Sequence, residues 1–145
     1  MKIMRADIRK KTKSWWMSGS REPRDSEQSL GRKMITFAIL EYLCPESDEH
    51  RVHAESWIFD EQSTDRDAGS FPWYCKKAGV NRKNVLLAVS DKKTATKLTS
   101  AFKLANNLNE LREKRSTDEP LRKRAERAIA IAKSGLSGIF STKPQ

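Results

Sequence analysis

Apolar residues recur at helical spacing over most of the chain beyond residue 28. Four stretches show the three- and four-residue steps that place apolar side chains on one face of a helix. Pro45 ends the first of them, since proline cannot continue the hydrogen-bond ladder, and Ser29 is its predicted N-cap. No segment alternates in the way a half-buried strand does. We therefore predict an all-α protein with helices over about 30–43, 49–60, 93–114 and 119–133.

Residues 70–89 combine two short helical patterns with a very short turn, which is the arrangement of a helix-turn-helix. The first helix needs a small residue where the second crosses it, and Cys75 occupies this position. The turn needs a residue that accepts a left-handed backbone, and this residue is Gly79. Val80 then fills the core, and Val85 returns to it from the second helix. The predicted N-caps of the two helices are Ser70 and Asn81.

This pattern divides the chain into four parts. We expect residues 1–28 to form a basic, flexible N-terminal arm, 29–90 a helical domain with the helix-turn-helix, 91–134 a C-terminal helical extension and 135–145 a tail. Gly135 is the predicted C-cap of the last helix. Leu86 and Leu87 are adjacent on the second helix of the motif, so one of them faces outward unless the extension covers it. We take this as an indication that residues 93–114 pack against the motif.

Charge is distributed unevenly along the 145 residues, whose formal net charge is +10. Residues 41–75 contain nine acidic and two basic residues, whereas residues 76–100 contain seven basic and one acidic. A basic excess favours polyanionic partners such as nucleic acid, an anionic membrane surface or an acidic protein. No stretch reaches the ~20 apolar residues that span a bilayer and no secretory signal is visible, so we predict a cytoplasmic protein with no membrane partner. Cys44 and Cys75 are predicted to be buried thiols.

The start of the second helix of the motif carries polar residues suited to DNA. In a helix-turn-helix this N-terminal end approaches the base edges. Arginine reads guanine and asparagine reads adenine through paired hydrogen bonds, and lysines hold phosphates. We therefore predict double-stranded DNA as the partner. The predicted contact residues are Asn81, Arg82, Lys83 and Asn84 on the helix, and Lys76, Lys77, Lys92 and Lys93 beside it.

The block from residue 30 to residue 89 resembles small helix-turn-helix regulatory proteins encoded by bacteriophages and prophages. The resemblance rests on the run AESWIF at 54–59, an acidic loop, the run SFPWYC at 70–75 and the run KKAGV at 76–80. It implies a transcription regulator of phage or mobile-element origin that works in the bacterial cytoplasm or nucleoid. It supplies no DNA target, and residues 15–16 and those after Ser90 lie outside it.

No catalytic constellation accompanies the motif, so we predict neither an enzyme nor a cofactor. His50 and His53 stand near acidic residues at a spacing that can hold a metal on a helix. Such a pattern is more typical of a solvated surface, and we predict no metal site. The adjacent Trp15 and Trp16 suit either an anchor for a partner or a short helix that packs back onto the domain.

Other functions stay open on the sequence alone. One is a phage-encoded adaptor that binds a host protein such as RNA polymerase, with the acidic block 41–67 or the Trp15–Trp16 arm as its working surface. Another is RNA binding through the basic C-terminal helices. The helices after Ser90 also offer an interface for a homodimer.

Overall fold

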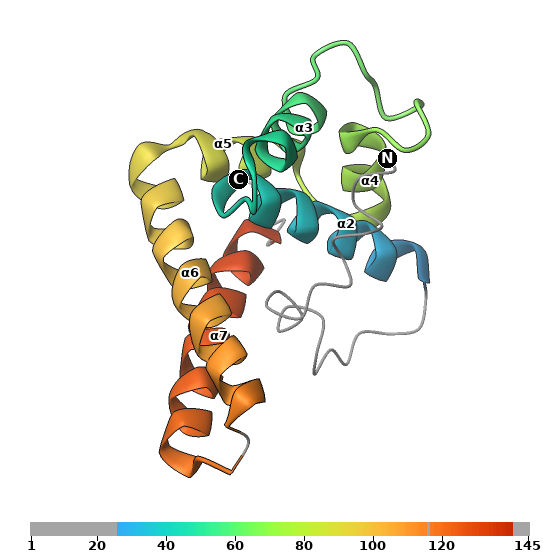
Figure 1. The fold of residues 1–145 in the computed structure, drawn as a ribbon. Coiled ribbons are helices and arrows are strands. Elements are labelled where there is room, and N and C mark those ends of the chain that lie inside the picture. Colours follow the sequence, from blue (N-terminus) through green and yellow to red (C-terminus); the bar gives the residue numbers. More distant parts are fainter. Residues whose placement is uncertain (1–25, 116, 141–145) are drawn as a thin grey trace.

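The computed structural model describes residues 26–115 and 117–140, which form six helices and no strand (Figure 1). The all-α prediction is therefore confirmed for this part of the chain. Helices also form where the apolar pattern predicts them, including the pair that makes up the helix-turn-helix. Their bounds are α2 Ser26–Leu43, α3 Asp48–Ile58, α4 Phe71–Ala78, α5 Arg82–Ser90, α6 Lys92–Lys114 and α7 Glu119–Phe140.

Helix α2 is the centre of the fold and packs against α3, α4 and α6. Its residues from Ile35 to Leu40 are all buried, because neighbouring helices cover it on several sides. The sequence pattern of α2 accordingly widens from a stripe to a continuous apolar run. This helix holds α4 in place, and so it positions the first half of the helix-turn-helix.

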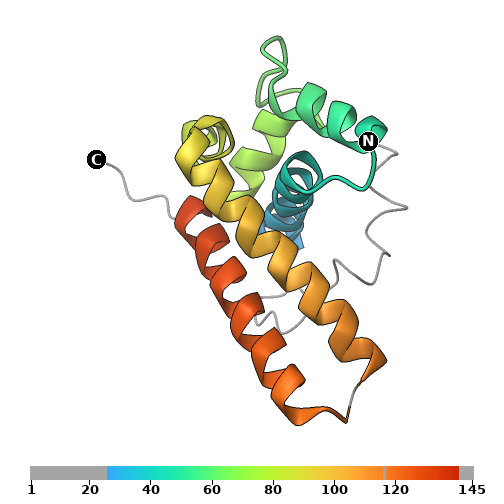
Figure 2. The same ribbon diagram turned by 60° about the vertical axis from the view of Figure 1, so that its left-hand side comes forward.

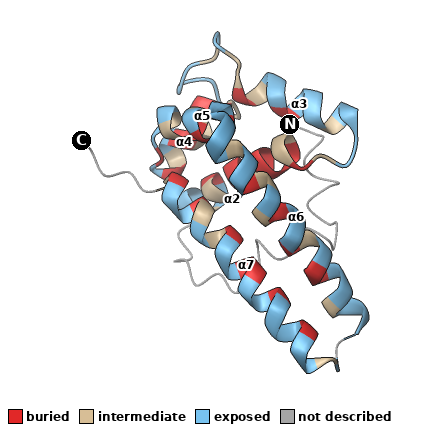
Figure 3. Ribbon diagram, turned by 90° about the vertical axis from the view of Figure 1, so that its left-hand side faces the viewer, coloured by how far each residue is buried: buried red, intermediate tan, exposed pale blue. Residues whose placement is uncertain are grey.

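Helices α6 and α7 pair side by side and form a long hairpin (Figures 1 and 2). The end of the hairpin near α5 joins the main core, as α5 contacts both helices. The far end extends beyond the other helices and holds a small separate cluster of Leu108, Leu121, Ala125 and Ala128. Figure 3 shows that the hairpin buries its inner side and leaves its outer side exposed. The predicted contact between residues 93–114 and the motif is thus confirmed through α5 and α6.

Two predicted helix ends are wrong. Helix α2 begins at Ser26, so Ser29 lies inside the helix and is not its N-cap. Helix α7 continues to Phe140, so Gly135 does not end it and residues 135–140 are not a tail. The reason is burial, because Leu136 and Ile139 pack into the main core. A Cβ atom on Gly135 would lie 2.9 Å from Leu98 Cδ2, which shows that glycine here lets α7 approach α6.

Both cysteines are buried and no disulfide joins them, as predicted. The Cys44 thiol lies 3.6 Å from the Thr99 carbonyl oxygen on α6, to which it donates a hydrogen bond. Burial raises the pKa of the Cys75 thiol to about 12, with a small opposing effect of Arg82. Cys75 is therefore a neutral thiol that packs in the main core, and it is not a reactive thiolate.

Candidate nucleic-acid interface

The turn between α4 and α5 has the geometry that its sequence predicts. Gly79 adopts a left-handed backbone with φ 70°, and its N–H donates to the Lys76 carbonyl at 3.2 Å. The Val80 N–H donates to the Cys75 carbonyl at 2.9 Å, and the Val80 side chain is buried. The Asn81 side chain then accepts a 2.9 Å hydrogen bond from the Lys83 N–H and caps α5. In this turn Gly79 provides the left-handed backbone, Val80 packs in the core and Asn81 caps α5.

Gly79→Ala is expected to lower the free energy of unfolding by about 1 kcal/mol, because an L-residue in the left-handed region is strained. The nearest atom to an added Cβ is Gln28 Nε2 at 3.5 Å, so the cost comes from the backbone and not from a clash. Urea denaturation followed by circular dichroism measures it. Gly79→Asn should recover most of the loss, and equal losses in both variants would contradict this account.

The loop between α3 and α4 is tied to both helices. The Trp57 indole N–H donates to the Gly69 carbonyl at 3.0 Å, and its ring packs against Phe71 at a centroid distance of 5.6 Å. The Ser70 hydroxyl donates to the Thr64 carbonyl at 3.0 Å and also accepts from the Trp73 N–H, as its predicted role as N-cap of α4 requires. These contacts hold the acidic loop against the helix-turn-helix.

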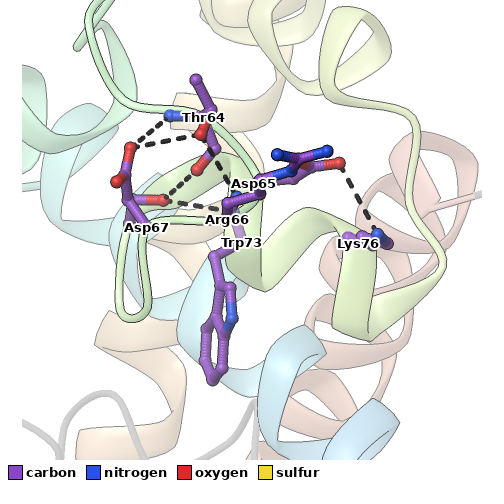
Figure 4. A network of polar contacts seen from close by, with 7 residues as sticks. Thr64, Asp65, Arg66, Asp67, Trp73 and Lys76 are labelled. Atoms are coloured by element: carbon purple, nitrogen blue, oxygen red, sulfur yellow. Dashed lines mark hydrogen bonds and ion pairs between the residues drawn. The ribbon is translucent and has the colours of Figure 1, made fainter.

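Two of the predicted DNA-contacting lysines form ion pairs within the protein. Lys76 forms an ion pair with Asp65 at 3.8 Å between Nζ and Oδ2 (Figure 4). Lys77 forms one with Glu27 at 3.5 Å, and its ammonium also lies 5.2 Å from the centre of the Trp73 ring. Both lysines stand on α4 and already have an internal negative partner. Because exposed pairs of this kind are weak, the acidic partner reduces the charge that these two lysines offer to DNA without removing it.

The Arg82 guanidinium points toward the α3–α4 loop. Its Nη2 donates to the Asp60 carbonyl at 3.2 Å, and its Nε is buried with no hydrogen-bond partner in the described residues. Asp60 has a lowered pKa, chiefly because the Ser63 hydroxyl hydrogen-bonds to its carboxylate, with a lesser contribution from the Arg82 charge. In this conformation Arg82 links α5 to the loop. Its assignment as a base-reading residue stays a prediction that requires the side chain to leave Asp60.

The remaining predicted lysines present their charge to solvent. Lys83 on α5, and Lys92 and Lys93 at the start of α6, are exposed and have no ion-pair partner within the described ranges 26–115 and 117–140. Sequence reasoning missed a fourth such residue, Lys97, which stands one helical turn after Lys93 and is equally exposed. The i to i+4 spacing of these two lysines could have revealed it. We call Lys83, Lys92, Lys93 and Lys97 the lysine face.

Asp91 stands between Lys83 and Lys92 in the sequence, directly before α6. Its carboxylate accepts hydrogen bonds from the Thr94 hydroxyl at 2.7 Å and the Thr94 N–H at 3.0 Å, and so it caps α6. The Thr94 hydroxyl is also the main reason that the pKa of Asp91 lies below its usual value. The carboxylate is therefore directed to the helix N-terminus, and no ion pair joins it to the four lysines in the part of the chain that the structure describes.

Leu87 gives α5 an apolar feature beside these lysines. It is 65% exposed, whereas Leu86 is partly covered by the core. A groove between α5, α6 and α7 is lined by Leu87, Leu98 and Ile139, together with Asn84 and Lys97. Of the polar residues predicted to read bases, Asn84 therefore lies at an apolar groove and makes a contact within the protein.

Other candidate features contribute little to this site. His50 hydrogen-bonds with the Ser47 hydroxyl at 2.9 Å, and His53 lies 3.9 Å from Glu49. Within the part of the chain that the structure describes, no three side chains of His, Cys, Asp or Glu are grouped to hold a metal ion. Trp15 and Trp16 lie outside the described residues.

None of the helices in residues 26–115 and 117–140 has the length and apolar content needed to cross a membrane. Comparisons with protein-family models, with curated proteins and with solved structures gave no match. The resemblance to phage-encoded regulators accordingly stays a prediction.

Proposed function

We propose that the protein binds double-stranded DNA through α5 and the first turns of α6, as a transcription regulator of phage or prophage origin. The observation that carries the proposal is the lysine face, which lies on and directly after the second helix of a helix-turn-helix. Such a helix is suited to the major groove, and unpaired lysines next to it are suited to the phosphates.

The eight predicted contact residues take different roles in this proposal. Lys83, Lys92 and Lys93 contact phosphates together with Lys97, and Asn81 caps α5 and orients its N-terminal end. Lys76 and Lys77 mainly hold the acidic residues of the loop and of α2. Base reading would come from Asn84, and from Arg82 once it releases the Asp60 carbonyl.

Lys83→Ala is expected to weaken binding to a duplex selected from random sequences by about 1 kcal/mol, roughly fivefold in affinity. Lys76→Ala is the matched control, because it removes the same charge from a lysine that is already paired with Asp65. Fluorescence anisotropy with the selected duplex measures both. Equal losses in the two variants would show that net charge, and not the lysine face, determines affinity.

A second candidate function is an adaptor that binds a host protein, such as the transcription machinery. The exposed Leu87 and the groove beside it favour this function, since a DNA-reading helix has little use for a large apolar side chain at its centre. Leu87→Ser, which changes no charge, should then abolish capture of a host protein from nuclease-treated lysate while leaving duplex affinity within a few-fold of the parent. Loss of duplex binding without loss of capture would exclude the adaptor.

A further inference from the structure

The outer side of α6 carries two large apolar residues that the described residues leave nearly half exposed. Leu104 is 48% exposed and Leu111 is 43% exposed. They are seven residues apart, so they lie on one face of the helix, with the exposed Asn107 between them. We call Leu104, Asn107 and Leu111 the α6 outer face. Its spacing is that of a seam between two packed helices.

This face lies on the C-terminal half of α6, which runs beside α7 in the hairpin (Figures 2 and 3), and its Asn107 borders a groove with residues 43–46. The interior there is small, because the far cluster contains two leucines and two alanines. A two-helix hairpin with so little interior gains substantially from a further helical layer. The α6 outer face is where such a layer would bury apolar surface.

The charges beside the α6 outer face indicate which partner helix would pack on it. Lys103 and Glu110 also lie seven residues apart and are exposed, and both line an open groove between α6 and residues 43–46. Lys103 has no ion-pair partner in the described residues, and Glu110 has the weak surface pair with Lys114 at 3.8 Å. One helix therefore presents a positive and a negative charge on the same edge of its apolar face.

These charges are self-complementary in only one orientation. If two copies pack with their α6 helices antiparallel and centred between residues 106 and 107, Lys103 of each copy lies beside Glu110 of the other. The same arrangement sets Leu104 of one copy at the level of residue 109 of the other, so its nearest seam residues there are Asn107 and Leu111. A parallel arrangement would instead place the Lys103–Glu110 edges of the two copies on opposite sides of the seam, where these charges cannot pair.

We propose that the α6 outer face binds a second copy of this chain, with the two α6 helices antiparallel around a two-fold axis. The interface is isologous, so each copy contributes the same residues and each ion pair occurs twice. This inference goes beyond the proposed function, and its test involves no DNA.

Sedimentation equilibrium of the full chain tests the proposal. The expected mass approaches twice 16.6 kDa as concentration rises. Lys103→Glu and Glu110→Lys should each raise the dissociation constant by about tenfold, because each creates two repulsive pairs per dimer. The double variant Lys103→Glu/Glu110→Lys should restore the affinity of the parent, since it only exchanges the two charges.

A second pair of variants separates packing from folding. Leu104→Ser/Leu111→Ser should give a monomer with the helical circular dichroism of the parent. Val52→Ser is the matched control, as Val52 on α3 is 49% exposed and lies outside the proposed interface. A mass of 16.6 kDa at every concentration, a dimer that survives the leucine changes, or a charge-exchanged variant that stays weakened would each overturn the proposal.

Discussion

Gly31→Val is expected to lower the free energy of unfolding by about 2–3 kcal/mol. Gly31 is a point of close approach between α2 and α4, since an added Cβ would lie 2.9 Å from the Ala78 backbone nitrogen and 3.0 Å from the Tyr74 carbonyl oxygen. Backbone atoms cannot rotate away as side chains do. The two helices must therefore separate, which loosens α4 and the turn that follows it.

Gly138→Ala is the matched control for this change. Gly138 is also a helical glycine, but an added Cβ meets no atom within 4 Å. The change should stabilise the protein by about 0.5–1 kcal/mol, because alanine is the better helix former. Thermal and urea unfolding of both variants, followed by circular dichroism, measure the contrast. If Gly31→Val were as stable as the parent, the close crossing of α2 and α4 would be wrong.

Trp57→Ala is expected to cost about 3 kcal/mol of folding stability. Its ring packs against Phe71 at 5.6 Å and against Tyr74 at 5.8 Å between centroids, while its N–H holds the Gly69 carbonyl. The side chain thus joins α3, the acidic loop and α4. Without it, the loop loses its main attachment to the first helix of the motif.

Trp57→Phe separates the two contributions of this residue. Phenylalanine keeps most of the ring packing and removes the hydrogen bond to Gly69, so the loss should be about 1 kcal/mol. Urea denaturation measured by circular dichroism gives both values. Similar losses for alanine and phenylalanine would mean that the hydrogen bond and not the packing holds the loop.

Much of the helix-turn-helix could be predicted from sequence because its requirements are local. Gly79, Val80 and Asn81 act within one turn, and Ser70 accepts from a residue three positions ahead. Patterns of this range are visible in a single sequence. The resemblance to phage-encoded proteins rests on the runs 54–59 and 70–75. These runs contain Trp57 and Phe71, whose rings pack on each other, so both runs contribute to the same contact in the fold.

The rest depends on contacts between distant parts of the chain. The ion pair of Lys77 with Glu27 joins residues 50 positions apart, and the hydrogen bond from Arg82 to Asp60 joins residues 22 apart. Neither contact is visible in local spacing, so the sequence alone predicted that Lys77 and Arg82 are both available to contact DNA. The C-terminal end of α7 could not be predicted for the same reason. The burial of Leu136 and Ile139 in the main core, and not a local stop signal, determines the length of this helix.

The salt dependence of duplex binding tests the proposed function most directly. With the four residues of the lysine face on phosphates, the slope of log K against log salt should be about −3 to −4. Replacing Lys83, Lys92, Lys93 and Lys97 by alanine should bring the slope close to zero. The matched control replaces four exposed cations on the hairpin, Lys114, Lys123, Arg124 and Arg127, and lowers the net charge by the same amount. It should keep most of the parent slope. A parent that binds no duplex, or two quadruple variants with the same slope, would contradict the account.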